Sequence, residues 1–418
     1  MERLSSSKGN NIRIRQVSEK MVIFKKEELR LLWPFYLGKL LASCSAVVVP
    51  IWVIFFQQQF TYFEIAIGLG LASIAMILFE IPTGAVADIF GRKFSVLLGF
   101  ILQSICWVLL AFVNTPFLLY LVFFVLGAVS TFISGAEDAW MIDWLKYRKK
   151  EELVHDMYVK IHSLFSLGFV ISPLLTTFLL FFIGMKHLFF VQAGATISIS
   201  FLLMIFAPES PCYHPTKKKK ALGAAMQLSK KGFHFLFTRK PLFYLVLAGL
   251  IASFPLNVGF VAWQPLLVNL SLPAQYLGIV FSIITLTGIV TPFFTKKLLA
   301  KMGHEKHYLT VTTLIEFVFL ASLYLVETPL FVYGILIYLL TRVMRDLKTP
   351  VTSVYFQSFI PSRMRATVTS VQSMLLGVVS FVCMIIGGYL MDKVGPQTTL
   401  ALFAFFLLPA SWIYQRIK

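Results

Sequence analysis

Long apolar runs alternate with short polar segments along the whole chain. A helix needs about 20 consecutive apolar residues to cross the hydrocarbon core of a bilayer. Runs of this length are expected at residues 31–56, 63–87, 94–113, 117–143, 160–184, 187–207, 242–268, 276–295, 307–326, 330–357, 367–390 and 396–414. The pattern therefore predicts an all-α membrane protein with twelve transmembrane helices.

One long polar segment, residues 208–241, divides these spans into two sets of six. The equal division predicts two pseudo-symmetric six-helix bundles. The expected units are a cytoplasmic N-terminal segment (1–30), an N-terminal bundle (31–207), a cytoplasmic linker (208–241), a C-terminal bundle (242–414) and a cytoplasmic tail (415–418). Within the linker, the apolar spacing from Ala221 to Phe237 suits an amphipathic helix on the membrane surface.

The charge of the chain is strongly positive, with 37 Lys and Arg residues against 19 Asp and Glu residues. Basic residues concentrate in cytoplasmic loops because they resist translocation. If both termini are cytoplasmic, Lys186 and Lys393 are the basic residues of the outer loops. The excess is therefore a topology signal of a multi-pass protein of the cytoplasmic (inner) membrane, and a nucleic-acid partner is not needed to explain it.

Cysteine placement and motif content point away from several other classes. Cys44, Cys106 and Cys383 lie in predicted spans and Cys212 lies in the linker, so no disulfide framework is expected. The sequence shows neither a Walker-type phosphate loop nor a His and Cys cluster with metal-ligand spacing. We therefore expect no cofactor, no metal and no enzymatic activity.

A short charged segment recurs in both halves of the chain. "GAVADIFGRK" at 84–93 aligns without gaps to "GIVTPFFTKK" at 288–297. The second copy keeps the glycine and the basic pair, but has Pro292 where the first has Asp88. A two-fold repeat of six spans is typical of transporters, in which two bundles rock about a central site.

The first copy resembles the signature loop between helices 2 and 3 of the major facilitator superfamily. "EIPTG" at 80–84, "SGAEDAWMIDWL" at 134–145 and "RATVTS" at 365–370 resemble patterns of one bacterial subgroup of that family. The resemblance covers the whole chain. It implies secondary transport of a small-molecule substrate by alternating access.

The physical chemistry of the motif predicts a conformational latch. Gly84 and Asp88 share a helix face, so Asp88 can meet the positive N-terminus of helix 11 near Thr367. Gly91 permits a tight turn, and Arg92 can reach a carboxylate at the inner end of helix 4. The predicted latch residues are Gly84, Asp88, Gly91, Arg92, Lys93 and Asp143. Such a latch would hold the outward-facing state. The alternative is a basic loop that only sets topology.

Several charged residues fall inside spans 1, 4 and 10, which line the central cavity in proteins of the family that this chain resembles. A charge inside a span costs at least ~2.5 kcal/mol and usually has a function. A set at similar depth comprises Lys39, Glu137, Asp138, Arg345, Asp346 and Lys348. One interpretation is an inner gate of ion pairs, and the other is a group that binds substrate or carries protons. The gate is favoured because buried charges are normally paired.

The candidate substrate cavity comprises Arg342 on helix 10 and Asn257, Trp263 and Gln264 on helix 7. Asp346 lies one turn from Arg342 and can neutralise it. A free Arg342 would favour an anionic or zwitterionic substrate. The helix 7 residues flank Pro255 and suit ligand contact, although a packed, kinked helix explains them as well.

Glu316, within span 9, has no obvious basic partner. It is expected to be either a proton-exchanging carboxylate or a hydrogen-bonded packing residue.

Departures from the family pattern limit the prediction of coupling. Helix 4 lacks the arginine usual in efflux members, and the helix 5 motif retains only Gly168 and Pro173. The leading hypothesis is proton-coupled export of a drug or metabolite. The alternatives are an uptake carrier or facilitator for a sugar or organic anion, and a membrane enzyme or lipid-handling protein. Protons and membrane lipids are the expected partners besides the substrate, and the chain is expected to be a monomer.

Overall fold

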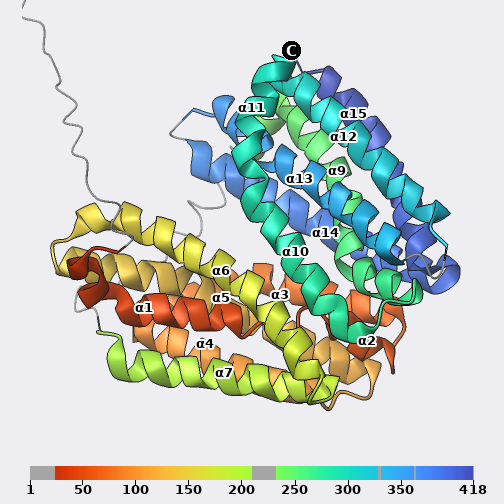
Figure 1. Cartoon of the computed structure of the whole chain (residues 1–418). Helices are drawn as coiled ribbons and strands as arrows, with labels where there is room; N and C mark the ends of the chain where they lie inside the picture. The colour runs from red at the N-terminus through yellow and green to blue at the C-terminus, as the bar shows by residue number, and fades with distance from the viewer. Residues whose placement is uncertain (1–23, 210–231, 328–330, 362–363, 418) are drawn as a thin grey trace, which may run out of the picture.

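The computed structural model describes residues 24–209, 232–327, 331–361 and 364–417 (Figure 1). The described residues form helices and connecting turns without any strand, so the predicted all-α fold is confirmed. The expectations for residues 1–23, for Cys212 and for most of the amphipathic helix at 221–237 lie outside the described residues. Residues 232–238, at the end of that segment, are helical.

Two groups of helices build the molecule. The first contains α1 (Lys26–Cys44), α2 (Trp52–Gln57), α3 (Tyr62–Phe90), α4 (Arg92–Leu110), α5 (Pro116–Tyr147), η1 (Glu151–Leu153), α6 (Val154–Leu180) and α7 (Met185–Phe206). The second contains α9 (Lys240–Asn269), η3 (Ala274–Tyr276), α10 (Leu277–Val290), α11 (Pro292–Met302), α12 (Glu305–Ser322), η4 (Leu323–Leu325), α13 (Phe331–Ser358), α14 (Arg365–Ala404) and α15 (Leu407–Gln415). We call these groups the first and second bundle.

Among the described residues, eight helices are long and apolar enough to cross a membrane, and a ninth crossing is the bent pair α10 and α11. The other three of the twelve expected spans are not counted among these nine, and each omission has a physical reason. The α1 and α2 pair is broken, and α13 carries four charged residues. The backbone of Gly395 (φ 81°) divides the last long apolar segment into two crossings. Twelve crossings therefore agree with the helices observed.

Local sequence signals explain where α3 and α4 begin. The Thr61 side chain accepts from the backbone of Glu64, and the Glu64 side chain accepts from the backbone N–H of Thr61, which caps α3. Gly91 then separates α3 from α4 with a φ of 99°, a conformation that favours glycine. This turn places Arg92 and Lys93 at the start of α4.

The first expected span, 31–56, is wrong as a single helix, because residues 45–51 are not helical. Pro50 lacks a backbone N–H and disfavours a helical residue before it, while Val47, Val48 and Val49 lose side-chain freedom in a helix. Backbone groups released at membrane depth need partners inside the protein. In this break the partners are side chains of α6, α7 and α9, described below.

The two bundles meet at one end and separate toward the other (Figure 1). We call the end that holds the start of α1 and the end of α15 the inner end, and the opposite end the outer end. At the outer end one apolar core contains residues of both bundles, including Trp52, Phe123, Trp263 and Leu400. At the inner end each bundle has a separate apolar core. The space between the bundles is therefore closed at the outer end and open at the inner end.

The bundles contact each other through α3 on α14 and α6 on α10. A Cβ on Gly278 would lie 2.0 Å from the Pro173 carbonyl oxygen, so α10 and α6 touch through their backbones. The Ser282 Oγ donates to the Val170 carbonyl oxygen at 2.7 Å one turn further along. This close approach at the outer half ties the bundles together on one side of the space between them.

Large apolar side chains cover the outside of both bundles. Phe182, Phe293 and Val354 are each more than 70% exposed. Contiguous apolar surface of this kind suits contact with lipid chains rather than water. The chain is thus an integral, multi-pass membrane protein.

Candidate functional site

Four pockets in the described structure share lining residues. An apolar pocket at the outer end meets a second pocket at Phe260, and this second pocket meets a third at Leu256 and Arg345. Ser130 joins the apolar pocket to a fourth, which contains acidic residues. The four pockets are therefore neighbours, and we call them together the central cavity; only the apolar pocket is lined by described residues of both bundles.

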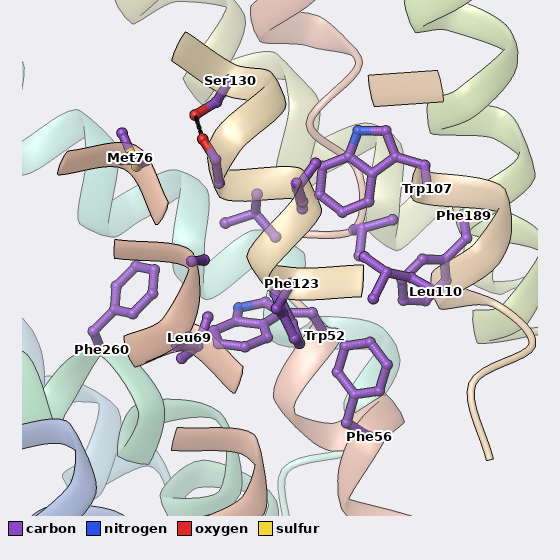
Figure 2. A pocket seen from close by; sticks show the side chains of 15 residues that line it. Trp52, Phe56, Leu69, Met76, Trp107, Leu110, Phe123, Ser130, Phe189 and Phe260 are labelled. Atoms are coloured by element: carbon purple, nitrogen blue, oxygen red, sulfur yellow. Dashed lines mark hydrogen bonds between the residues drawn. The ribbon is translucent and has the colours of Figure 1, made fainter. Parts of the chain in front are cut away.

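The apolar pocket has a volume of about 260 Å³. Its aromatic walls are Trp52, Phe56, Trp107, Phe123, Phe189 and Phe260. Figure 2 shows Phe260 on one side of the pocket and Trp107 and Phe189 on the other. The hydroxyl of Ser130 donates to the Gly127 carbonyl oxygen of its own helix at 2.7 Å. The pocket thus offers a ligand apolar and aromatic surface.

The second pocket, which we call the arginine pocket, lies on the second bundle and has a volume of about 190 Å³. Its walls include Phe260, Trp263, Thr285, Tyr338, Arg342 and Arg345. The predicted cavity residues Arg342 and Trp263 thus line it together, and the Trp263 ring stacks on Phe281 with centroids 5.4 Å apart. No acidic residue is among the nine described residues that line this pocket.

The fourth pocket, which we call the acidic pocket, contains the first-bundle part of the expected inner network. The Nζ of Lys39 lies 2.7 Å from a carboxylate oxygen of Glu137, which is 5% exposed. Asp138 lines the same pocket, and within the described part of the chain it forms no ion pair. These residues lie on α1 and α5, the first and fourth expected spans. Counting depth along the two spans correctly placed the three residues together.

The second-bundle members of that network lie elsewhere. Lys348 pairs with Glu316 and also donates to the Thr313 hydroxyl at 3.3 Å. The expectation that Glu316 lacks a basic partner is therefore wrong, because α12 and α13 pack side by side and bring the two together. The ion pairs of Lys39 and Lys348 each stay within one bundle. A single inner network joining both bundles is thus absent from the described residues in this conformation.

Arg345 lies between the arginine pocket and the third pocket. Arg342 approaches Asp346 at 3.8 Å, while the other carboxylate oxygen of Asp346 accepts from the Thr287 hydroxyl at 3.1 Å. The Nε atoms of Arg342 and Arg345 are buried and have no hydrogen-bond partner in the described structure. Asp346 therefore forms an ion pair with Arg342 alone, and Arg345 has no carboxylate partner among the described residues.

The predicted latch residues sit at the inner end of the first bundle. Arg92 pairs with Asp143 at 2.6 Å and also donates to the Ala139 carbonyl oxygen. Lys93 donates to the Met204 and Ala207 carbonyl oxygens at 3.0 and 2.8 Å, where a cation complements the negative end of α7. These contacts fix the turn between α3 and α4 onto α5 and α7.

The glycine face of the motif is open in this conformation. A Cβ added to Gly84 would have no atom within 4 Å, so the close helix approach expected there is not formed. Further toward the outer end, a Cβ on Gly377 of α14 would lie 3.4 Å from Ile77 of α3. The two helices are thus in contact near Ile77, and they separate before Gly84.

Two of the four predicted cavity residues have other contacts. Asn257 donates to the Ser253 carbonyl oxygen and accepts from the Ser380 hydroxyl, which joins α9 to α14. Gln264 is fully buried and makes hydrogen bonds to the backbone at the break between α1 and α2. Its Oε1 accepts from the Val53 N–H at 3.0 Å, and its Nε2 donates to the Val49 carbonyl oxygen at 2.9 Å. Neither side chain lines any of the four pockets in this conformation, and a role for them in substrate binding stays a prediction.

The sequence did not reveal the side chains that bond the backbone between α1 and α2, or the one that joins the two bundles at the outer end. Gln192 accepts from the Val48 N–H at 3.0 Å, and Thr176 donates to the Val47 carbonyl oxygen at 2.7 Å. Asp392 on α14 accepts from the Tyr62 and Phe63 N–H groups at 2.8 and 2.9 Å, which caps α3 across the bundle interface. Pro50 after three valines was the available signal for the break. No feature of the sequence around Asp392 indicated its contact with the start of α3.

Comparisons with known proteins agree with this architecture. The family model described as "Major Facilitator Superfamily" matches residues 36–382. The "Uncharacterized MFS-type transporter YxaM" of Bacillus subtilis (strain 168) is 20% identical over 360 residues, which covers 86% of this chain and 88% of that protein.

Solved structures show the same fold at low identity. The nucleoside transporter NupG superposes with a TM-score of 0.71 at 16% identity, covering 92% of this chain and 98% of that chain. A bacterial homologue of the human lysosomal transporter Spinster, in an inward-facing and unoccupied conformation, gives 0.70 at 14% identity, covering 94% and 97%. These similarities, with the family match over most of the chain, show that the chain belongs to the major facilitator superfamily and is a secondary transporter.

Proposed function

We propose that this transporter exports a small organic solute, a drug or a metabolite, in exchange for protons. It acts as a monomer in the cytoplasmic membrane with both termini in the cytoplasm. The observation that carries the proposal is the shape of the space between the bundles. A shared outer core closes one end, while separate inner cores leave the cavity open toward the termini. A solute would therefore enter from the cytoplasm in this conformation.

The acidic pocket supports proton coupling. Glu137 is buried against Lys39, and the neighbouring Asp138 has no ion-pair partner in the described residues. Carboxylates at membrane depth commonly carry protons in transporters. Protonation of Glu137 would release the Lys39 ammonium, and Asp138 offers it an alternative partner one residue away. Proton uptake would thus change the charge of the cavity wall.

The signature loop supports alternating access. Arg92 is held by Asp143, whereas the Gly84 face is open and Ile81 and Phe90 are exposed. In the outward-facing state this face would close on the start of α14, with Asp88 at its positive end. The loop would then act as a latch that stabilises the state opposite to the one observed.

The decisive experiment measures a pH gradient in proteoliposomes that are acidic inside, reported by an acridine dye. Anionic, neutral and cationic solutes are added outside one at a time. An antiporter releases protons when its solute enters, so dye fluorescence recovers for one class of solute. A symporter leaves the gradient intact under these conditions. Absence of recovery for every solute would overturn proton antiport.

Matched variants link the signal to the latch. Asp88→Asn is expected to abolish the recovery while leaving expression and size-exclusion behaviour unchanged. Asp156→Asn is the control, because Asp156 pairs with Lys25 near the inner surface and lies outside both the latch and the cavity. Full activity of Asp88→Asn would reject the latch.

A second candidate, uptake or facilitated passage of an organic anion, is favoured by the arginine pocket alone. It predicts solute counterflow without a pH response. The same liposomes, loaded with unlabelled solute and challenged with labelled solute, would separate it from antiport.

A further inference from the structure

We infer that the transported solute is an amphipathic organic anion, with an aromatic or aliphatic body in the apolar pocket and a carboxylate, sulfonate or similar head group at Arg342 and Arg345. This inference rests on the proposed transport function and adds the chemical class of the substrate. The argument depends on three properties of the central cavity: its uncompensated positive charge, the size of its apolar pocket and the connection between the two.

The positive charge is concentrated where carboxylates are scarce. The arginine pocket contains two guanidinium groups on successive turns of α13, and the described residues that line it include no acid. The Arg345 guanidinium makes neither a hydrogen bond nor an ion pair with the described residues, and its buried Nε has no acceptor. An isolated charge in a low-dielectric site is costly unless a counter-charge reaches it. A bound anion would supply that counter-charge.

The nearby carboxylate does not remove this need. Asp346 lies outside the lining of the pocket, its approach to Arg342 is long at 3.8 Å, and it also accepts from Thr287. Glu316, the other acid near Arg345, is engaged by Lys348. Planar guanidinium groups match the two oxygens of a carboxylate, so this pair suits an anionic head group better than a cation or an uncharged polyol.

The apolar pocket fits the body of such a molecule. A cavity of roughly 150 Å³ lined by apolar side chains stays dry and binds benzene. The pocket here has about 260 Å³, enough for a fused two-ring aromatic group or a short branched alkyl group. Its rings come from both bundles: Trp52 faces Phe260 with centroids 5.8 Å apart. A ligand there would contact both moving parts of the transporter.

The two pockets are adjacent. Phe260 on α9 lines both, with the apolar pocket against the first bundle and the arginine pocket on the second. One molecule can therefore place its apolar body on one side of Phe260 and its head group on the other. The acidic pocket lies beyond Ser130 on the inner side of the first bundle, where a cationic group would have to sit instead.

The test measures binding by equilibrium dialysis of the purified full chain in nanodiscs. The probes are three naphthalene compounds of similar size: 2-naphthoate, 2-naphthylmethanol and 2-naphthyltrimethylammonium. We expect 2-naphthoate to bind at least tenfold more tightly than either of the others. Equal binding of all three, tighter binding of the cation, or no binding of any probe at millimolar concentration would overturn the inference.

Variants assign the charge preference to the arginines. Arg345→Gln should weaken the binding of 2-naphthoate at least tenfold and leave the affinity for 2-naphthylmethanol unchanged. Arg345→Lys should lose an intermediate amount of affinity for 2-naphthoate. Arg148→Gln is the matched control, because Arg148 is exposed beyond α5 and stacks on Trp144. Leu126→Trp fills the apolar pocket and should weaken the binding of the neutral and anionic probes alike. A charge preference that survives Arg345→Gln and Arg342→Gln would also contradict the assignment.

Flux measurements keep this inference separate from the proposed function. Binding of 2-naphthoate without counterflow in liposomes would leave the anion-binding site in place and reject transport of the bound anion. Counterflow of a cationic or neutral solute, with no competition by 2-naphthoate, would leave transport in place and reject the anion.

Discussion

Replacement of Gln264 by leucine should open the outer end of the transporter. Gln264 belongs to the second bundle but makes two hydrogen bonds to the broken backbone of helix 1, at Val49 and Val53. Leucine keeps the apolar volume and removes both bonds. In the outer-closed conformation Gln264 is fully buried, so the two backbone groups would lack partners there. In the outer-open conformation water can reach them.

The size of the effect follows from these two bonds. A typical protein hydrogen bond contributes about 1 kcal/mol net, so losing both disfavours the closed conformation by about 2 kcal/mol. That free energy corresponds to a factor of roughly 30 in the equilibrium. A conformer present at about 1% would therefore rise to roughly one quarter of the molecules.

The assay is a distance measurement between spin labels by pulsed electron paramagnetic resonance. Labels at Gln59 and Glu327, in a variant without its natural cysteines, report the separation of the two bundles because both residues are exposed at the outer end. We expect Gln264→Leu to increase the population at long distance. Gln192→Leu is the control, since Gln192 supports the same break from within the first bundle at Val48. An unchanged distribution, or an equal shift in both variants, would refute the reasoning.

Two further predictions concern charges. Lys39→Ala should destabilise the protein by about 3 kcal/mol, because Glu137 is left buried without its partner. Adding Glu137→Gln should restore part of the loss, measured as thermal unfolding in detergent, whereas purely additive losses would dismiss the pair. Asp392→Ala removes the cap from Tyr62 and Phe63, worth about 1 kcal/mol, and should shift the same spin-label distances toward opening. Asp392→Asn should shift them less, and no shift in either would show that the cap does not hold the outer end.

Some contacts of the site could be derived from the sequence because they follow from depth. Lys39 and Glu137 lie at similar distances from the ends of their spans, and the structure places them 2.7 Å apart. Arg92 and Asp143 both lie at inner helix ends, and they pair at 2.6 Å. A rise of 1.5 Å per residue converts position along a span into depth, so residues at matching depth on neighbouring helices become candidates for contact.

Depth gave no information about which face of a helix points where. Asn257 and Gln264 have the polarity of ligand-binding residues, but they face α14 and helix 1 respectively. Glu316 seemed isolated along its own span, yet it meets Lys348 because α12 packs on α13. The rotation of each helix about its axis depends on the summed packing of its neighbours, and a single span does not encode that sum.

The sequence by itself determined the class of the protein and the position of most of its membrane-crossing segments. A bilayer requires every backbone hydrogen bond to be made internally, so twenty-residue apolar runs have one structural solution, and their number and flanking charges can be counted. The signature loop added the family, and the family match over residues 36–382 established it.

The tertiary structure alone decided which end of the cavity is closed and what lines it. Gln264 bonds a residue 211 positions away, and the apolar and arginine pockets meet at Phe260 between two bundles. Such contacts join segments that are independent in the sequence. They exist in one conformation of a transporter and are exchanged for others when the bundles rock. No local pattern can therefore specify them.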